Sequence, residues 1–188
     1  MNVVFKLQMV GFGVCLKLKY SLMDMAPIEI VEGYIPGSIG RVAELHGRYY
    51  ARHWGFSSFF EAKVASELAE FIQRYESSRD GFWTASINGV IEGSITLDGL
   101  HAESEGAHLR WFIVSENFQG QGIGNQLMEA ALGFCRKHGY RRAFLWSFEG
   151  LGAACHLYSK YGFKVTRQHP GSTWGTEVNE QLYELRFA

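Results

Sequence analysis

The chain reads Glu116-Asn117-Phe118-Gln119-Gly120-Gln121-Gly122-Ile123-Gly124-Asn125-Gln126-Leu127 between the apolar run 109–114 and a helical pattern that continues to about His138. A strand, a glycine-rich turn and a helix N-terminus in this order form an anion site. The first N–H groups of a helix have no partner inside the helix and carry partial positive charge. Glycine also lets a phosphate approach the main chain closely. We therefore predict that residues 119–125 hold a phosphate-bearing ligand.

Two common glycine-rich motifs do not fit this turn. A dinucleotide-binding turn needs a third glycine where Leu127 stands. A P-loop needs glycine and lysine followed by serine or threonine, and the sequence has no such run. A turn that only joins a strand to a helix stays open as an alternative.

A second motif lies downstream of the helical pattern. Residues 142–147 read as a strand, and the following helical segment carries Ala154 and, four residues later, Tyr158. The segment ends in Gly162-Phe163, where the glycine suits the left-handed position after a helix C-terminus.

The pattern Gln119-x-x-Gly122-x-Gly124, together with this second motif, resembles the GNAT family of N-acetyltransferases from about Ile28 to Phe187. Within the family, the chain resembles the acetyltransferase half of bacterial proteins that fuse a MarR-like winged helix to a GNAT domain. The stretches behind this narrower resemblance are 33–40, 45–50, 54–56, 83–85, 145–147 and 174–175. The stretch before Ile28 is too short for a winged helix, so DNA binding is not implied.

The resemblance implies an α/β (α+β) fold, with a mixed, mostly antiparallel central sheet of about six to seven strands and helices on both faces. It implies that the strands on either side of the motif helix splay apart, and that the pantetheine arm of acetyl-CoA lies in the gap. The expected activity is acetyl-CoA-dependent transfer of an acetyl group to an amine, by direct attack on the thioester. A small-molecule amine is the expected acceptor and a protein amine the second choice. The alternative is a non-catalytic acyl-CoA-binding sensor or interaction module.

The same resemblance assigns the site residues. The residues expected to bind acetyl-CoA are Phe112, Ile113, Val114, Gln119, Gly120, Gly122, Ile123, Gly124 and Asn125. A main-chain N–H near Ile113 or Val114 would stabilise the negative charge that develops on the carbonyl oxygen. Tyr158 matches the family tyrosine that protonates the departing thiolate, and a phenol is a reasonable acid for a thiol. Tyr161 is expected to pack.

The general base is left open by the sequence. The candidates are Glu149, His108, Glu103, Glu105 and Glu61, or water alone. His46 and His53 lie two helical turns apart without a third ligand, so we predict no metal.

Two positions that are often polar in relatives are apolar here, Leu151 and Phe148. We therefore expect a more apolar acceptor pocket, suited to an aromatic or apolar amine. The aromatic residues from which its lining would come are Trp54, Phe56, Phe59, Phe60, Trp83, Trp146, Phe148 and Trp174.

Bulk composition favours an enzyme domain. The chain has 188 residues, 47% of them hydrophobic, and a net charge of −1, so nothing indicates a nucleic acid or membrane partner. Cys15, Cys135 and Cys155 form no disulfide or metal pattern, which favours reduced thiols in a cytoplasmic protein. The family also makes dimerisation through the C-terminal strands plausible.

The domain prediction divides the chain into residues 1–27, an N-terminal extension, and residues 28–188, a single acetyltransferase domain. The extension lacks the layout of a secretory signal, and we expect Met23 or Met25 to be the natural start. The expected strands are 28–31, 82–87, 90–97, 107–114, 141–147, 163–168 and 181–187. The expected helices are 38–53, one capped by Ser58 with Glu61, one from about 123 that Gly139 ends, and 151–161. Asn88-Gly89 predicts a hairpin turn, and Pro170-Gly171-Ser172 a loop.

Overall fold

The computed structural model describes residues 27–187, so the predictions about the N-terminal extension, its start and Cys15 lie outside the described residues. The strands are β1 (Glu29–Glu32), β2 (Gly81–Ile87), β3 (Val90–Asp98), β4 (Ala107–Val114), β5 (Arg142–Phe148), β6 (Lys164–Gly171) and β7 (Val178–Arg186). The helices are α1 (Ser38–Trp54), α2 (Ser58–Gln73), the short 3-10 helix η1 (Glu116–Phe118), α3 (Ile123–Lys137) and α4 (Gly152–Lys160).

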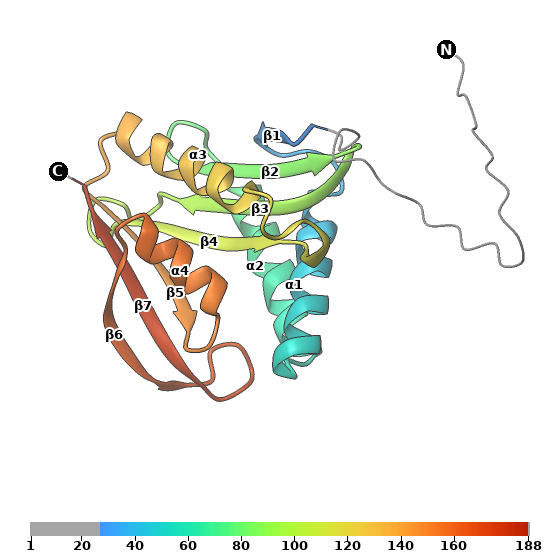
Figure 1. Ribbon diagram of the computed structural model, residues 1–188. Coiled ribbons are helices and arrows are strands. Elements are labelled where there is room, and N and C mark those ends of the chain that lie inside the picture. The colour runs from blue at the N-terminus through green and yellow to red at the C-terminus, as the bar shows by residue number, and fades with distance from the viewer. Residues whose placement is uncertain (1–26, 188) are drawn as a thin grey trace, which may run out of the picture.

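The described strands form one mixed sheet in the order β1-β2-β3-β4-β5-β7-β6. Neighbouring strands in it are antiparallel except for the pair β4 and β5, which is parallel. Figure 1 shows α3 and α4 on one face of the sheet and α1 and α2 on the other. Each face has its own core, with Leu127 of α3 and Phe71 of α2 fully buried. The predicted fold class is confirmed.

The hairpin between β2 and β3 forms as the sequence predicts. Asn88 and Gly89 both have positive φ, at 52° and 76°. A type I′ turn requires this of both central residues, and asparagine and glycine tolerate it best.

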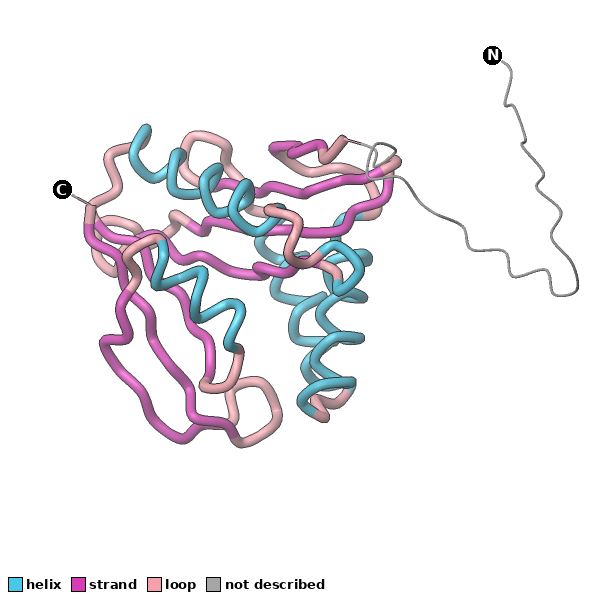
Figure 2. Tube along the Cα trace, in the orientation of Figure 1, coloured by secondary structure: helices cyan, strands magenta, loops and turns pink. Residues whose placement is uncertain are grey.

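The strands β4 and β5 diverge after a short contact. They pair only at Ala107 with Ala143 and at His108 with Phe144, and Figure 2 shows them separating beyond that point. The expected splay is thus present. A bulge on the other edge of β4 accompanies it, because Ile95 of β3 stands opposite two β4 residues, Trp111 and Phe112.

Trp111 in this bulge has a positive φ of 45°, which is costly for a residue with a side chain. Its carbonyl accepts a hydrogen bond of 2.8 Å from the buried hydroxyl of Ser94 on β3. Its indole ring is packed beneath the guanidinium of Arg110, which lies 4.1 Å from the ring centroid. These contacts hold the bulge in place.

Several element boundaries differ from the sequence predictions, and three of the differences have a clear physical reason. The cap of α2 is Ser57, not Ser58, because the Ser57 hydroxyl accepts from the N–H of Phe59 at 3.3 Å. The predicted loop at Pro170-Gly171 is the end of β6, where these residues pair with Asn179 and Val178 of β7. β6 is the last strand in the sheet order, and proline is tolerated in an edge strand because one side needs no N–H donor. β7 consequently begins three residues before the predicted start.

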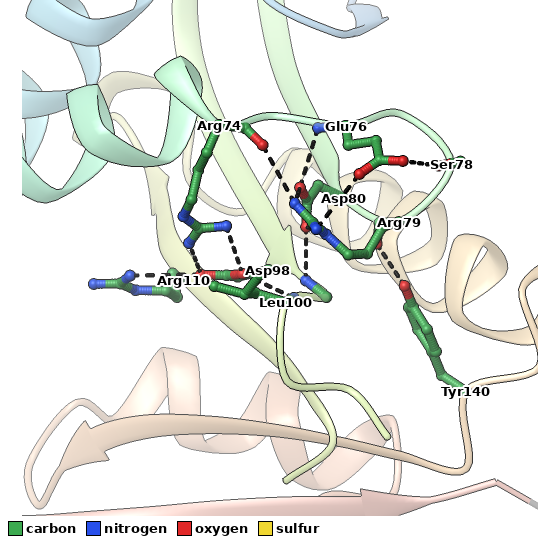
Figure 3. A network of polar contacts seen from close by, with 10 residues as sticks. Arg74, Glu76, Ser78, Arg79, Asp80, Asp98, Leu100, Arg110 and Tyr140 are labelled. Atoms are coloured by element: carbon green, nitrogen blue, oxygen red, sulfur yellow. Dashed lines mark hydrogen bonds and ion pairs between the residues drawn. The ribbon is translucent and has the colours of Figure 1, made fainter. Parts of the chain in front are cut away.

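A polar network ties the end of α2 to the sheet (Figure 3). Asp80 is fully buried, and its carboxylate accepts from the main-chain N–H groups of Glu76 at 3.1 Å and Gly99 at 2.9 Å. The guanidinium of Arg79 lies 2.9 Å from the same carboxylate, while Asp98 at the end of β3 pairs with Arg74. The carboxylate of Asp80 therefore fixes the connection between α2 and β2.

We expect Asp80→Ala to lower the free energy of unfolding by about 3 kcal/mol, because it leaves the buried N–H of Gly99, the partly buried N–H of Glu76 and a guanidinium without their acceptor. Glu76→Ala is the matched control, since the Glu76 side chain is exposed and its ion pair with Arg79 is long at 3.5 Å. Urea unfolding of both variants makes the comparison. Equal stability of the two variants would contradict the role given to Asp80.

Candidate functional site

The glycine-rich segment lines a cavity of about 290 Å³, which we name the loop pocket. All nine residues predicted to bind the cosubstrate line it, namely Phe112, Ile113, Val114, Gln119, Gly120, Gly122, Ile123, Gly124 and Asn125. The opposite wall is the start of α4, from Gly150 to Ala154 with Leu157, and Tyr49 and Tyr50 of α1 complete the lining. The structure thus brings the end of β4 and the glycine loop to one cavity.

The loop ends in a helix N-terminus that no described side chain caps. Gly122 is the N-cap of α3 with a φ of 86°, and Gly120 has a φ of 75°. The carbonyl of Gly122 accepts from the N–H of Gln126 at 3.1 Å, so the N–H groups of the preceding helical residues have no partner within the helix. No heavy atom of the described residues lies within 4 Å of a Cβ built on Gly120 or Gly122. This open, electropositive loop suits an anion.

A side chain at Gly124 would have little room in the loop pocket. A Cβ built there would lie 3.3 Å from the ring of Phe112 and 3.5 Å from a methyl group of Leu157. A larger side chain would project between β4 and α4, into the space that the pocket occupies. The glycine is therefore needed for close approach of a ligand, not for backbone conformation.

The end of β4 keeps main-chain groups free on its gap-facing edge. The N–H of Ser115 donates to the carbonyl of Glu92 on β3 at 2.7 Å. Successive residues of a strand point their polar groups to opposite edges, so Val114 directs its N–H and carbonyl toward the gap. The side-chain amide of Gln119 donates to that carbonyl at 3.1 Å. The Val114 N–H remains available to a ligand.

A second cavity of about 450 Å³, the aromatic pocket, adjoins the loop pocket. Tyr50, Phe112 and Leu151 line both cavities, so the two lie side by side. The aromatic residues of its lining are Tyr50, Phe60, Trp111, Phe112, Trp146, Phe148, Tyr158 and Trp174. Of the aromatic residues singled out in the sequence, Phe60, Trp146, Phe148 and Trp174 reach it, whereas Trp54, Phe56, Phe59 and Trp83 do not.

The two apolar positions noted in the sequence fall at this junction. Phe148 is buried among aromatic rings, with Trp54 edge-on at 4.7 Å and Trp174 at 5.6 Å. Leu151 is 8% exposed and is the N-cap residue of α4. Both therefore contribute apolar wall where relatives often have a polar group.

Tyr158 of α4 lies on the wall of the aromatic pocket. Its side chain is buried, and its ring is 6.2 Å from Phe112, which lines both cavities. Desolvation by burial, with smaller contributions from Tyr50, Cys155 and Tyr183, raises the pKa of Tyr158 above its ordinary value of 10. The phenol is thus a proton donor at neutral pH. Tyr161 lines neither cavity and donates to Glu129 at 2.8 Å, as expected of a packing residue.

Among the five candidate bases, only His108 lines a pocket. Its ring stacks on Phe144 at 4.3 Å, and desolvation, helped by Arg110, lowers its pKa to about 3. It is neutral at pH 7. Glu149 is exposed and accepts from Asn179 at 3.0 Å, and Glu61 lies against Gly47 of α1. Glu103 and Glu105 belong to the turn between β3 and β4.

Several polar residues of the aromatic pocket were missed, among them His46, Glu67 and Glu180. His46 was considered only as a partner of His53, yet it is buried, and its Nδ1 bonds to the Val42 carbonyl at 2.8 Å. Glu67 is one helical turn from Lys63, a spacing that could have placed both on one face of α2. Glu180 was missed because the predicted β7 began one residue too late to include it.

His53 does not approach His46. Its Nε2 lies 2.7 Å from a carboxylate oxygen of Glu116 at the surface. Within residues 27–187, no group of three or more histidine, cysteine or acidic side chains is arranged to hold a metal ion. No helix of the same range is long and apolar enough to cross a membrane.

The family model of the GNAT acetyltransferase family matches residues 41–163. The chain therefore belongs to this family. It is 26% identical over 120 residues to an uncharacterised N-acetyltransferase of Methanocaldococcus jannaschii, a match that covers 62% of this chain and 53% of the relative. The chain thus spans about half the length of that curated relative.

Solved structures share the fold. A GNAT-family acetyltransferase from Staphylococcus aureus is 20% identical with a TM-score of 0.68, and the match covers 85% of this chain and 99% of that one. An acetyltransferase from Salmonella typhimurium, solved with its cofactor acetyl-CoA, is 15% identical with a TM-score of 0.68, over 86% and 94% of the two chains.

The buried histidine His46 makes stability depend on pH. Desolvation lowers its pKa from 6.5 to about 4 in the folded protein, so the unfolded chain binds the proton more readily. The contribution of His46 is fully present above pH 6.5 and is lost as the pH falls toward 4. Between pH 7 and pH 5, we expect this one group to cost up to about 2 kcal/mol.

His46→Asn, which keeps a donor for the Val42 carbonyl, should show a smaller loss of unfolding free energy between pH 7 and pH 5. His53→Asn, at the surface, is the control and should keep the wild-type dependence. Urea unfolding of the wild type and both variants at pH 7 and pH 5 gives the three differences in unfolding free energy. An unchanged dependence in His46→Asn would show that His46 is not held neutral.

Proposed function

We propose that this chain is an acetyl-CoA-dependent N-acetyltransferase that acetylates a small amine by direct attack on the thioester. The observation that carries the proposal is the meeting of the loop pocket and the aromatic pocket beside the free edge of β4. Membership of the GNAT family supports it, as does the related Salmonella structure that holds acetyl-CoA.

The loop pocket fits the cosubstrate. The N–H groups at the start of α3 would bind its pyrophosphate, and Gly120 and Gly122 leave room for the phosphates to reach them. The edge of β4 at Phe112, Ile113 and Val114 would bind the amide groups of the pantetheine arm, as an added strand does. Bound acetyl-CoA would supply the reactive thioester.

The Val114 N–H is our candidate for stabilising the developing oxyanion. It points into the gap between β4 and β5 and belongs to a strand whose bulge is fixed by Ser94. A donor that is already oriented needs no reorganisation during the reaction, which is the source of its catalytic effect.

Tyr158 would donate a proton to the departing thiolate. Its burial raises the pKa and keeps the phenol protonated. A non-catalytic acyl-CoA-binding module would need the glycine loop but would not need Tyr158 on the wall of the aromatic pocket. The presence of both favours an enzyme. His46 and His108 line the acceptor side, but burial lowers the pKa of each and makes both weaker bases than a free imidazole. Water is therefore our candidate for taking the proton that an ammonium group must lose before the amine attacks the thioester.

Three narrower expectations belong to the proposal as predictions. We expect a cytoplasmic protein with reduced thiols, a likeness to the acetyltransferase half of MarR–GNAT fusions, and dimerisation through the C-terminal strands. Burial raises the pKa of the Cys135 thiol to about 12, in keeping with a thiol that only packs.

Gly124→Glu should abolish acetyl-CoA binding, because the new side chain fills the loop pocket and adds negative charge beside the phosphates. Wild type should bind with micromolar affinity, roughly −8 kcal/mol in calorimetric titration. Gly133→Glu is the matched control, because a Cβ at that position of the same helix meets nothing within 4 Å. If Gly124→Glu bound acetyl-CoA with wild-type affinity, the claim that acetyl-CoA binds in the loop pocket would be wrong.

Tyr158→Phe should lower kcat by about a hundredfold or more, the usual contribution of a general acid, while acetyl-CoA affinity is kept. Tyr161→Phe serves as the control and should keep wild-type kcat. Release of CoA, followed with a thiol reagent and a panel of amines, reports both rates. A Tyr158→Phe enzyme with wild-type kcat would rule out the acid role.

A further inference from the structure

The aromatic pocket contains a buried carboxylate that the proposed chemistry does not use, that of Glu180. Glu180 lies on β7 and is 3% exposed. Its two oxygens accept from the main-chain N–H of Thr173 at 2.8 Å and from the Thr173 hydroxyl at 3.0 Å. His169 of β6 stands directly opposite Glu180 in the sheet, but within residues 27–187 no arginine, lysine or histidine forms an ion pair with Glu180. A buried negative charge without a counter-charge is costly, so a cationic ligand would stabilise this site.

Aromatic side chains surround this carboxylate. Phe148 of β5 stands directly opposite Glu180 in the sheet, and Trp146, two residues earlier, lies on the same face. The ring of Trp174, adjacent to Thr173, is 5.6 Å from that of Phe148. All of them line the aromatic pocket. A cationic ligand bound at Glu180 would therefore contact flat apolar surfaces beside the carboxylate.

The loop between β6 and β7 is held across the pocket by α2. Gly175 has a φ of 83°, and a Cβ built there would lie 2.5 Å from the ring of Phe59. This close contact fixes the loop segment that carries Thr173 and Trp174. The carboxylate and the aromatic walls are therefore preorganised, which reduces the entropic cost of binding.

The cations of the same pocket limit the charge of the ligand. Glu67 pairs with both Lys63 and Arg110, and Arg110 also lies 3.8 Å from Asp98, so these two positive charges are partly compensated. Arg167 is exposed on β6 with its guanidinium 5.1 Å from the centroid of the Trp146 ring. A second positive charge on the ligand would be repelled by Arg167. One positive charge on an apolar body fits best.

We propose that the acceptor is a monoamine with an aromatic body, and that Glu180 is the specificity-determining residue that binds its ammonium group. The role of this amine as acetyl acceptor rests on the proposed function. Its binding at Glu180 does not depend on acetyl transfer. Phe148, Trp146 and Trp174 bind the aromatic body, and Arg167 disfavours polyamines.

The first experiment compares 2-phenylethylamine, ethanolamine and spermidine as substrates of the full chain. We expect kcat/KM for 2-phenylethylamine to exceed both others by about tenfold or more, as expected for one buried apolar group. Glu180→Gln should raise the KM for 2-phenylethylamine about tenfold or more, the effect of losing a hydrogen bond to a charged group. Glu177→Gln, an exposed residue of the neighbouring loop, is the matched control and should keep wild-type values.

The second experiment separates charge recognition from folding. By calorimetry, wild type should bind 2-phenylethylamine more tightly than 2-phenylethanol, and Glu180→Gln should bind the two equally. Trp174→Ala, which keeps the carboxylate, should reduce the preference for 2-phenylethylamine over ethanolamine. Preference for spermidine or ethanolamine, or an unchanged preference for the amine over the alcohol in Glu180→Gln, would overturn the inference.

These results are distinguishable from failure of the proposed function. A wild type that binds acetyl-CoA and acetylates only hydrophilic amines would overturn this inference alone. The wild type could instead bind no acetyl-CoA but still bind 2-phenylethylamine through Glu180. That result would support the amine site and refute the acetyltransferase function.

Discussion

The early end of the pairing between β4 and β5 is the constraint on which the rest of the structure depends. The two strands share register at two positions and then separate, while β4 continues to Val114 beside β3. Strand edges normally have their N–H and carbonyl groups paired, and an unpaired edge attracts another chain or ligand. Here the free edge faces two pockets, with the glycine loop directly after it. One irregularity of the sheet thus produces both the binding edge and the space beside it.

The loop pocket and the aromatic pocket also differ in charge. On the loop side, the positive end of α3 faces outward without a described side-chain cap, and α3 itself is secured by a buried apolar face that includes Leu127. On the acceptor side, burial keeps His46 and His108 neutral, while the carboxyl group of Glu180 is buried in the aromatic pocket. A phosphate-rich ligand would therefore be attracted to the loop pocket and a cationic amine to the neighbouring aromatic pocket.

Much of this architecture was predictable from local sequence patterns. Asn88-Gly89 specified the hairpin, Gly139 ended α3, and the loop from Gln119 to Asn125 lies where its glycines predicted. These features depend on backbone geometry that few residue types allow. The cap of α2 was placed one residue late, since two adjacent serines compete for the position and only the geometry chooses Ser57.

The acceptor side was less predictable because it depends on tertiary packing. Nothing in the local sequence marks Trp111 for a positive φ, which arises from the bulge between β3 and β4. Glu180 fell outside the predicted strand 181–187, and Pro170 and Gly171 indicated a break where the edge strand in fact continues. Four of the candidate bases, all glutamates, line neither pocket. The sequence could not show this, because the position of an isolated acidic residue in space cannot be inferred from its place in the chain.

The most direct test of the account is residue-resolved amide hydrogen exchange with and without acetyl-CoA. The N–H of Ser115 is bonded to β3, whereas that of Val114 faces the gap. We predict that Val114 exchanges faster than Ser115 in the free protein and becomes protected when acetyl-CoA binds, with little change at Ser115. A Val114 amide that is already protected, or that is unaffected by acetyl-CoA, would contradict the claim that the free edge of β4 is the binding edge.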